Sequence, residues 1–555
     1  MGAGSLTCNP ETSVMNIRST TFLLILALLF TSSHAAEQTQ VARGTVYHDA
    51  NENGMRDASE SPLPGVYVSN GLDVVATDKM GGYELMVGDD TIIFVIKPRD
   101  WMTPIDEQNI PRFYYIHKPA GSPDEQFKFK GVKPTGPLPA SIDFPLTPSA
   151  DETNFSVIVM GDPQPDNIDD VSLYANEVVA ELVGTDARFA IAMGDLVGDD
   201  LSLFEPINRV HAVLGIPWYS VYGNHDMNLL SPNDKYADET FERVYGPPDY
   251  AFQYGQVHFI FLDNVRWNGP QGIDPRPRNN NYGGYNGWLH EEQLTFVANY
   301  VATVPLDDRI VVCTHIPLPT LYSFTEPHMT PQFGRLLEIL SSHPHTMSYS
   351  AHTHINEHYL AGPQDGYRSA TGSIHLHHNV ATGSGSWYRG PHDEQGFPVT
   401  TMRDGAPNGF IKANFQGNVY RERFKGSRMP ADYQLAIHAP SVIPPAEAGN
   451  TIVLANVFNG NEKSTVHLQI DQEGDWIRMQ QRPQTDPGYT ALRDQQYACP
   501  PPGRRLLKHT AMVTPHIWEV SLPDDLAVGV HVLEVMVTDM FGQKERGTRL
   551  IELRP

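Results

Sequence analysis

Cysteine is scarce in this chain, with only three among 555 residues. A fold held together by a disulfide framework is therefore excluded, and export cannot be argued from cysteine usage. Cys8 lies in a segment that we expect to be removed. Cys313 belongs to the apolar run 310–313 and is predicted to be a small core residue, with a disulfide to Cys499 as the alternative.

Positive charge and long apolar runs are also scarce. Lys and Arg number 39 against 65 Asp and Glu, which gives a formal net charge of −26. A chain this acidic is a poor candidate for generic binding to nucleic acid or anionic membrane, so no nucleic-acid-binding surface is expected. No apolar run after residue 36 reaches membrane length, so no transmembrane anchor is expected.

Residues 15–36 are typical of a secretory signal peptide. Arg18 supplies a positive start, residues 22–30 form the apolar region, and residues 33–35 offer small side chains for cleavage. We therefore expect residues 1–36 to be a leader and signal peptide and the protein to be secreted or periplasmic. A buried N-terminal helix is the alternative, and the choice of start codon between Met1 and Met15 stays open.

The abundant residues indicate several loop-rich domains. Glycine and proline occur 45 times each, and 40% of residues are hydrophobic. Short apolar runs predict a β-sandwich and linker over residues 37–150. Alternating strand and helix patterns then predict an α/β domain over 151–408, and short strands return in a predicted C-terminal β-sandwich over 409–555. Within the α/β domain, helices are predicted at 168–183, 203–214, 291–304 and 333–340.

A calcium-loop pattern lies inside the first predicted sandwich. Its oxygen ligands follow the spacing of an EF-hand loop, with Gly54 at the sixth position: Asp49, Asn51, Asn53, Asp57 and Glu60. The flanking segments resemble collagen-adhesin B-type and carboxypeptidase-regulatory-like modules. A solvated Asp/Asn turn is the equal alternative to a Ca²⁺ site, and no flanking helix pattern is visible.

Five apolar runs in the α/β segment end in side chains that bind metals. The sequences at these ends are Gly161-Asp162-Pro163-Gln164, Gly194-Asp195, Gly223-Asn224-His225-Asp226, Thr314-His315 and His352-Thr353-His354. The carboxyl ends of parallel strands meet at one edge of a sheet, so these side chains are predicted to converge on one metal site.

This ordered set resembles the calcineurin-like metallophosphoesterase superfamily over residues 155–360, in its exported bacterial form with β-sandwich domains on both sides. The resemblance implies a four-layer α/β/β/α core, flanked by two all-β domains. It implies two divalent ions, Mn, Fe, Zn or Mg, that share Asp195. The first ion is assigned Asp162, Gln164 and His354, and the second Asn224, His315 and His352. Gln164 stands where the family usually has histidine, and Ala351 replaces a glycine.

The same resemblance implies hydrolysis of a phosphate ester. Two divalent ions about 3.5–4 Å apart neutralise the phosphate oxygens and activate water. His225 is assigned the proton transfer to the leaving group, and Asp226 is expected to fix its tautomer and raise its pKa. Gly198 stands where purple acid phosphatases have a metal-bound tyrosine, so no purple chromophore is expected.

Other residues near these motifs are weaker candidates. Trp387, Tyr388 and Arg389 are predicted to contact substrate, with core or rim packing as the alternative. The same two alternatives apply to the aromatic segment 282–288. Histidines 375, 377 and 378 are a further, weaker candidate set for substrate contact. Asp199 and Asp200 are interpreted as helix caps, and Asp263 and Asn264 as structural.

Two hypotheses follow from these observations. The first is an exported metal-dependent phosphoesterase, which acts on a bulky diester such as a lipid head group, a nucleotide or a glycan-linked phosphate rather than on a small monoester. The second is a non-catalytic surface or glycan-binding protein on a degenerate scaffold, which only Gln164 favours. The sequence leaves the substrate, the metal identity and the oligomeric state open.

Overall fold

The computed structural model describes residues 39–123, 127–270, 284–321 and 328–555. The predicted leader and signal peptide therefore lie outside the described residues. Residues Thr39–Pro555 form one compact unit. Among the described residues, no helix is long and apolar enough to cross a membrane.

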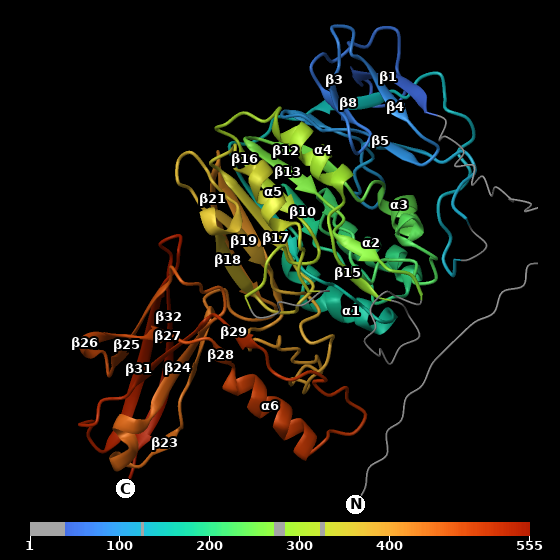
Figure 1. Cartoon of the computed structure of the whole chain (residues 1–555). Coiled ribbons are helices and arrows are strands. Elements are labelled where there is room, and N and C mark those ends of the chain that lie inside the picture. Colours follow the sequence, from blue (N-terminus) through green and yellow to red (C-terminus); the bar gives the residue numbers. More distant parts are fainter. Residues whose placement is uncertain (1–38, 124–126, 271–283, 322–327) are drawn as a thin grey trace, which may run out of the picture. The chain divides into compact units, whose positions relative to one another are not determined.

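Two four-stranded sheets form the N-terminal β-rich part (Figure 1). One has the order β4-β1-β8-β6 and the other the order β3-β2-β5-β7. The strands are β1 Gln40–His48, β2 Tyr67–Ser69, β3 Val74–Ala76, β4 Gly82–Val87, β5 Thr91–Val95, β6 Trp101–Met102, β7 Tyr114–His117 and β8 Phe144–Pro148. Lys97 joins this part to the next by a bridge to Phe252 and by donating from Nζ to the Gln253 carbonyl at 2.8 Å.

The central part contains two sheets with helices outside them, as the predicted four-layer core requires. The first sheet has the order β11-β10-β9-β20-β21 and the second the order β12-β13-β16-β17-β19-β18. The first contains β9 Asn154–Met160, β10 Phe189–Ala192, β11 Trp218–Ser220, β20 Gly409–Gln416 and β21 Val419–Gly426. The second contains β12 Tyr250–Tyr254, β13 Val257–Phe261, β16 Arg309–Cys313, β17 Thr346–Ser350, β18 Glu357–Ala361 and β19 His375–Asn379.

The core helices lie at the segments predicted from apolar spacing, except the helix Glu239–Tyr245, which was not predicted. They are α1 Ile168–Glu177, α2 Phe204–Ala212, α3 Glu239–Tyr245, α4 Glu291–Val301 and α5 Phe333–Leu340. Apolar residues of α1 and α2 share a buried cluster with the first sheet, and those of α4 and α5 share another with the second sheet. The predicted helix 168–183 ends early at Glu177 and continues as a 3₁₀ turn, Val179–Leu182.

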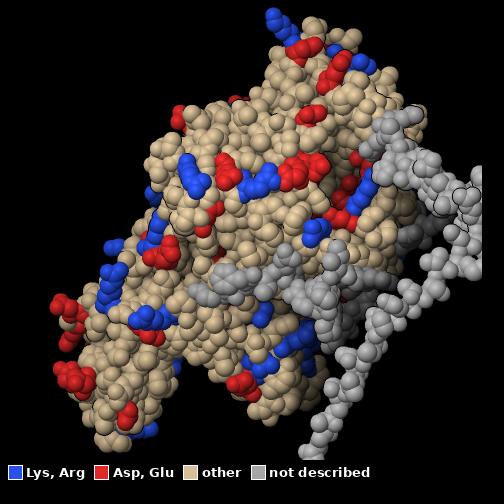
Figure 2. Space-filling model, in the orientation of Figure 1, with Lys and Arg blue, Asp and Glu red and all other residues tan. Residues whose placement is uncertain are grey.

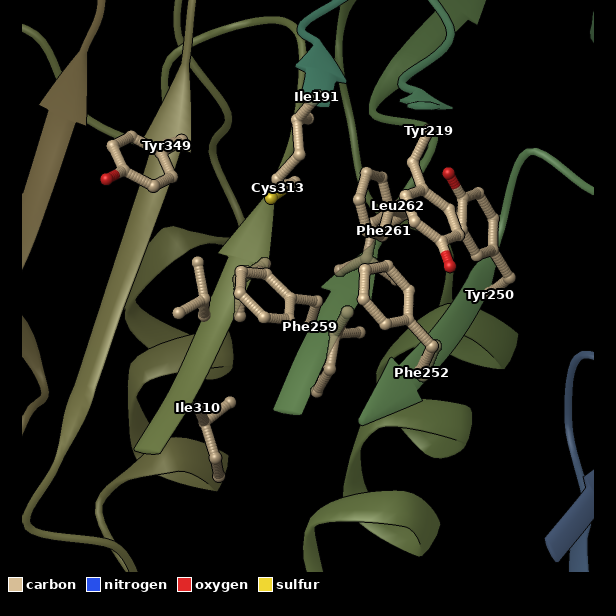
Figure 3. Close-up of a cluster of buried hydrophobic side chains, with 14 of the residues drawn as sticks. Ile191, Tyr219, Tyr250, Phe252, Phe259, Phe261, Leu262, Ile310, Cys313 and Tyr349 are labelled. Atoms are coloured by element: carbon tan, nitrogen blue, oxygen red, sulfur yellow. The ribbon is translucent and has the colours of Figure 1, made fainter. Parts of the chain in front are cut away.

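The space between the two sheets is filled by large apolar side chains (Figure 3). Tyr219 of β11 stacks on Phe252 of β12 with ring centroids 4.0 Å apart, and Phe189 of β10 contacts Phe259 of β13 at 5.2 Å. Cys313 is fully buried here, and both Cys313 and Cys499 are free thiols, so the alternative disulfide is not formed. Burial of this apolar area holds the two sheets face to face and sets the position of the strand ends.

The C-terminal sandwich begins later than predicted. β20 pairs antiparallel with β9 through six residue pairs, from Ile411↔Val159 to Gln416↔Asn154, so the hairpin after residue 409 belongs to the first core sheet. Alternation along a strand shows which face is buried but not which strand is its neighbour. The placement of this hairpin in the C-terminal domain is therefore corrected.

Two further sheets follow, as the predicted sandwich requires. One contains β22 Leu435–His438, β24 Ile452–Val457, β30 Ile517–Ser521 and β27 Gln480–Gln481, and the other contains β23 Val442–Ile443, β32 Lys544–Leu553, β31 Gly529–Thr538, β25 Thr465–Ile470 and β26 Glu473–Arg478. Between β27 and β30 the chain forms a ribbon, β28 Gln484–Thr485 with β29 Val513–Thr514, and the unpredicted helix α6 Pro487–Ala498.

Candidate metal centre and catalytic site

All the predicted ligands follow the carboxyl ends of core strands. β9, β10 and β11 run parallel in the first sheet, and β16 and β17 run parallel in the second. Their ends face the same edge of the core, so residues nearly 200 positions apart meet. Suitable ligand atoms of Asp195, His315 and His352 lie within 4.8 Å of one another.

His315 and Asn224 form one side of this centre. His315 donates from Nδ1 to the Met193 carbonyl at 2.8 Å, which leaves Nε2 facing Asn224 Oδ1 at 3.1 Å and Asp195 Oδ1 at 3.2 Å. Burial lowers the pKa of His315, but Asp195 and Asp162 outweigh it and raise that pKa to about 9. A bound metal would take the place of the Nε2 proton, because the neutral ring in this tautomer directs a lone pair to the same point as the two oxygen atoms. Several hydrogen-bond acceptors that face one another in this way are suited to bind a cation with their lone pairs.

His354 and Gln164 repeat the arrangement on the other side. His354 donates from Nδ1 to the Gly385 carbonyl at 2.5 Å, and its Nε2 lies 3.0 Å from Gln164 Oε1. Asp162 Oδ1 and His352 Nδ1 are buried and have no hydrogen-bond partner among the described residues. Buried polar atoms rarely stay unpaired. These orphaned atoms, with the facing acceptors, fit a pair of divalent ions.

Burial and close charges shift the pKa values of the ligands. Burial raises the pKa of Asp162 to about 7, with Asp195 adding to the shift. Burial also raises the pKa of Asp195, but the His315 and His225 imidazoles outweigh it and hold that pKa below its usual range. Burial lowers the pKa of His354 to about 3, so this ring is a neutral ligand.

The backbone at these strand ends is strained. Eight residues of this neighbourhood have φ between 30° and 72°, a region that costs a side-chain-bearing residue about 1–3 kcal/mol. They are Asp162, Gln164, Asp195, Asp199, His352, His354, Trp387 and Tyr388. Sharp turns of this kind aim successive side chains of one short motif at the same point.

Glycines permit the closest approaches between these turns. A Cβ on Gly223 would lie 2.0 Å from the Asp195 amide nitrogen, and one on Gly194, where φ is +90°, would lie 2.5 Å from His315 Nδ1. The glycines that precede Asp195 and Asn224 are therefore required by packing of one ligand motif against another.

We expect Gly223→Ala to lower both stability and metal content. The added methyl group must push the Asp195 turn away, which costs about 1–3 kcal/mol as overpacking. Thermal unfolding with metal analysis of the purified protein tests this. Gly334→Ala is the matched control, because a Cβ there meets nothing closer than 3.6 Å and lies in α5, where alanine is favoured. Equal behaviour of the two variants would contradict the assignment.

His225 faces the centre beside these ligands. Its amide donates to Asp195 Oδ1 at 2.8 Å, and its Nε2 lies 3.9 Å from Asp195 Oδ2, with 33% of the side chain exposed. Its Nδ1 lies 2.6 Å from Asp199 Oδ1. Burial lowers the pKa of His225, but Asp195 and then Asp199 outweigh it and raise the pKa to about 10. The His225 ring therefore lies on the open side of the centre, with Nδ1 held by Asp199.

Asp226 does not hold the His225 ring, which corrects the prediction. Its carboxyl accepts from the Gly223 amide at 3.0 Å and the Val197 amide at 3.2 Å, and burial raises its own pKa well above the usual range. Asp226 adds to the raised pKa of His225 only as a nearby charge. Asp199 fixes the orientation of the ring instead, while Asp200 caps the 3₁₀ turn Leu201–Leu203, as predicted.

The comparisons with known proteins are consistent with this geometry. Three family models match in order: the N terminal of calcineurin-like phosphoesterase over residues 50–134, calcineurin-like phosphoesterase over 155–356, and the C terminal of calcineurin-like phosphoesterase over 377–544. The chain belongs to the calcineurin-like phosphoesterases. This family acts on phosphoric ester bonds, so the chain is a hydrolase, and divalent metals are its cofactors.

Solved structures are similar to this phosphoesterase at low identity. A dimetal phosphatase from Danio rerio is 13% identical, covering 49% of this chain and 96% of its own, with a TM-score of 0.32. The purple acid phosphatase PPD1 from yellow lupin (Lupinus luteus) seeds is 12% identical, covering 70% and 67%, with a TM-score of 0.33. A metallophosphoesterase from Sphaerobacter thermophilus is 16% identical, covering 49% and 89%, with a TM-score of 0.18. The comparison with curated proteins returned no match.

We expect Asp199→Asn to slow this phosphoesterase without removing its metals. Loss of the carboxylate frees the His225 ring, and loss of such an orienting partner typically costs about 10- to 100-fold. Turnover and metal content measured on the same sample test this. Asp169→Asn is the control, because Asp169 is exposed in the first turn of α1. A metal-depleted Asp199→Asn protein, or two variants of equal activity, would contradict the role.

The three predicted substrate-contacting residues behave differently. Trp387 stacks on the ligand His354, with ring centroids 4.0 Å apart, and borders the centre. Tyr388 is buried and donates from its hydroxyl to the Pro163 carbonyl, so it positions the turn before Gln164 rather than touching substrate. Arg389 is partly exposed.

In the aromatic segment 282–288, Tyr285 lies at the site, with its ring edge-on to that of His352 and the centroids 5.9 Å apart. Residues 282 and 283 lie outside the described residues.

The histidines of β19 belong to the core. His377 contacts Ser348 and Ser350, and His378 donates from Nδ1 to Glu422 at 2.8 Å. Glu422 also accepts from His358 at 2.7 Å and from Tyr420 and Asn459. These carboxylate and imidazole groups satisfy one another, so they join β18, β19 and β21 as a buried polar network. Asn264 is structural, as predicted, and accepts from the His315 amide at 3.1 Å.

The predicted calcium loop folds into one compact turn. Asp49 accepts from the Asn53 and Gly54 amides, and Asp57 accepts from the side chains of Asn51 and Asn53. Glu60 accepts from the Ala50 amide at 3.0 Å. The loop therefore saturates its own oxygen atoms with hydrogen bonds, and calcium binding stays a prediction.

Proposed function

We propose that this phosphoesterase is an exported phosphodiesterase with a two-metal mechanism. One observation carries the proposal: the ligand atoms of His315, Asn224, His354 and Gln164 converge around Asp195, beside the His225 ring, which Asp199 holds in place. A ligand set alone would also suit metal storage or a structural role. The acid placed beside the ligands supports bond cleavage.

Each residue has a distinct part in the reaction. Asp195 lies between the two ligand sets and would be shared, with Asp162, Gln164 and His354 on one side and Asn224, His315 and His352 on the other. When bound, the metal pair supplies positive charge for the phosphate oxygens and for the attacking water. His225 Nε2 donates a proton to the leaving oxygen, while Asp199 holds Nδ1.

A groove next to the acid supports a substrate with a bulky leaving group. It has a volume of about 350 Å³, and its lining includes Asp199, the partner of His225. The other lining residues are Lys128, Phe129, Gly198, Asp200, Met227, Asn228, Leu229 and Leu230. A small monoester leaves this mainly apolar groove empty, whereas a diester with a large alcohol fills it.

The metal identity and the location complete the proposal. The first ligand set offers three oxygen-bearing side chains and only one histidine, which favours Mn²⁺, Mg²⁺ or iron over Zn²⁺. The apolar segment 22–30 and the small residues after it support export through the membrane to a secreted or periplasmic location.

Hydrolysis of chromogenic esters before and after chelation tests the proposed function. We expect bis(p-nitrophenyl) phosphate to be hydrolysed faster than p-nitrophenyl phosphate, chelation to remove the activity, and Mn²⁺ to restore it. A protein that binds metals but hydrolyses neither ester would instead support the non-catalytic binding function. A monoester preference would overturn the assignment of a diester.

A further inference from the structure

Positive charge gathers beside the metal centre of this otherwise acidic protein. The pKa of His509 is lowered to about 4. Burial is the largest cause, followed by four cationic side chains: Arg403, Lys508, Arg389 and Arg493. All four cations therefore lie close to one ring. Figure 2 shows Lys and Arg side chains gathered beside α6 and the chain that follows it, which contains Lys508.

Hydrogen bonds and an ion pair fix this region against the core. The Gly390 amide donates to the Arg505 carbonyl at 3.0 Å, and the Arg505 guanidinium pairs with Asp170 of α1. The Tyr489 hydroxyl of α6 donates to the His509 carbonyl at 3.0 Å. The bond from Gly390 thus holds Arg505 next to residues 387–390, and the bond from Tyr489 holds His509 against α6.

The same region reaches the metal ligands. Trp387 contacts His354 on one side at 4.0 Å and His509 on the other at 4.7 Å, so one indole separates the ligand from the cationic segment. Arg403 is close enough to lower the pKa of His354. Arg389 lies within electrostatic range of Asp166, which is two residues after Gln164.

Three of these cations lack a carboxylate partner. Within the described part of the chain, Arg389 and Lys508 make no ion pair, and Arg403 donates only to the Thr510 carbonyl at 3.3 Å. Arg428, by contrast, pairs with Asp393 at 2.5 Å. Like charges held together without a counter-charge repel one another, so this arrangement favours binding of an anion.

We propose that Arg389, Arg403 and Lys508 bind a second anionic group of the substrate. The preferred substrates are then phosphate esters that carry a further negative group a few bonds from the phosphorus that is attacked. This inference rests on the proposed function and specifies the substrate class of that same site. Guanidinium and ammonium groups recognise carboxylate or phosphate by charge-assisted hydrogen bonds.

A matched pair of chromogenic diesters tests the proposal on the full-length protein. p-Nitrophenyl 2-carboxyethyl phosphate and p-nitrophenyl propyl phosphate share a leaving group and differ by a carboxylate in place of a methyl group. At low salt, we expect kcat/KM for the carboxylate ester to be roughly tenfold higher than kcat/KM for the propyl ester. The difference should arise mainly from a lower KM. Added NaCl lowers the ratio because it screens exposed charges. A ratio of one or less at low salt overturns the proposal.

Variants that remove one positive charge show which side chains cause the preference for the carboxylate ester. Arg389→Gln and Lys508→Gln each lower the ratio by about 3- to 5-fold, with the larger loss on the carboxylate ester. Lys508 is exposed, so its replacement does not disturb packing. Lys544→Gln, which removes an equal charge from the exposed edge of β32, keeps the ratio. A ratio that falls equally in all three variants shows a general charge effect and overturns the assignment.

A binding measurement separates this inference from the proposed function. Titration calorimetry of the Mn²⁺-loaded protein compares 3-phosphonopropionate with propylphosphonate, which cannot be hydrolysed. Tighter binding of 3-phosphonopropionate, lost in Lys508→Gln, supports the cationic site even when neither ester is hydrolysed. Hydrolysis of both esters at equal rates, with equal affinity for both phosphonates, retains the phosphodiesterase and overturns the anionic substrate class.

Discussion

Asp195→Asn is expected to abolish ester hydrolysis and to empty the metal centre. Asp195 Oδ1 lies 3.2 Å from His315 Nε2, and Asp195 Oδ2 lies 3.4 Å from the Gln164 side chain, so this one carboxylate faces both ligand sets. An amide removes the shared negative charge. Because loss of an outer partner alone costs 10–100-fold, loss of the shared ligand should cost more than about 1,000-fold in kcat/KM.

Metal analysis and steady-state kinetics on the same preparation test this prediction. Asp169→Asn is the matched control, since Asp169 is exposed in the first turn of α1. The control should keep both metals and full activity. An Asp195→Asn protein that retains two equivalents of metal and near-normal turnover would show that the carboxylate is not the shared ligand.

His225→Ala is expected to lower turnover while both metals stay bound. The ring lies beside the centre, with Nδ1 2.6 Å from Asp199, and it is not one of the convergent ligand atoms. General acid catalysis typically contributes about 10²- to 10⁴-fold. The loss should be largest for an ester with an alkyl leaving group, because an alkoxide needs a proton more than a nitrophenolate does.

The way in which the loss of kcat depends on the leaving group identifies the role of His225. The kcat of His225→Ala is compared with wild type on an alkyl diester and on a nitrophenyl diester, with metal content checked for each sample. His467→Ala on β25 is the control for loss of a histidine elsewhere. Equal losses on the two esters would indicate charge stabilisation rather than proton donation, and a loss of metal would make His225 a ligand.

Local patterns in the sequence were sufficient for the core elements. The apolar spacing of residues 333–340 predicts α5 with the bounds that it has, because one face of that helix is buried. α6 was missed because it buries little, with only Tyr489 and Gln496 buried. Its start carried a usable signal, since Asp486 caps the helix and Pro487 takes its first position.

Which strands pair, and which residue contacts His225, could be determined only from the tertiary structure. β20 and β21 alternate as any half-buried strands do, and only the exposed edge of β9 explains why they join the core sheet. Asp199 itself has a φ of +70°, and its carboxylate contacts a ring 26 residues away. Asp226, adjacent in sequence, instead turns inward to backbone amides.

The sequence alone determined the ligand types and the strands that carry them, because metal chemistry restricts side chains and buried strands need apolar runs. The tertiary structure decided how those ligands are aimed and what surrounds them. Trp387 and the cationic side chains of Arg403 and Lys508 meet beside His354 only because α6 and the chain after it dock on the core. Contacts between distant segments depend on the packing of whole elements, which no local pattern records.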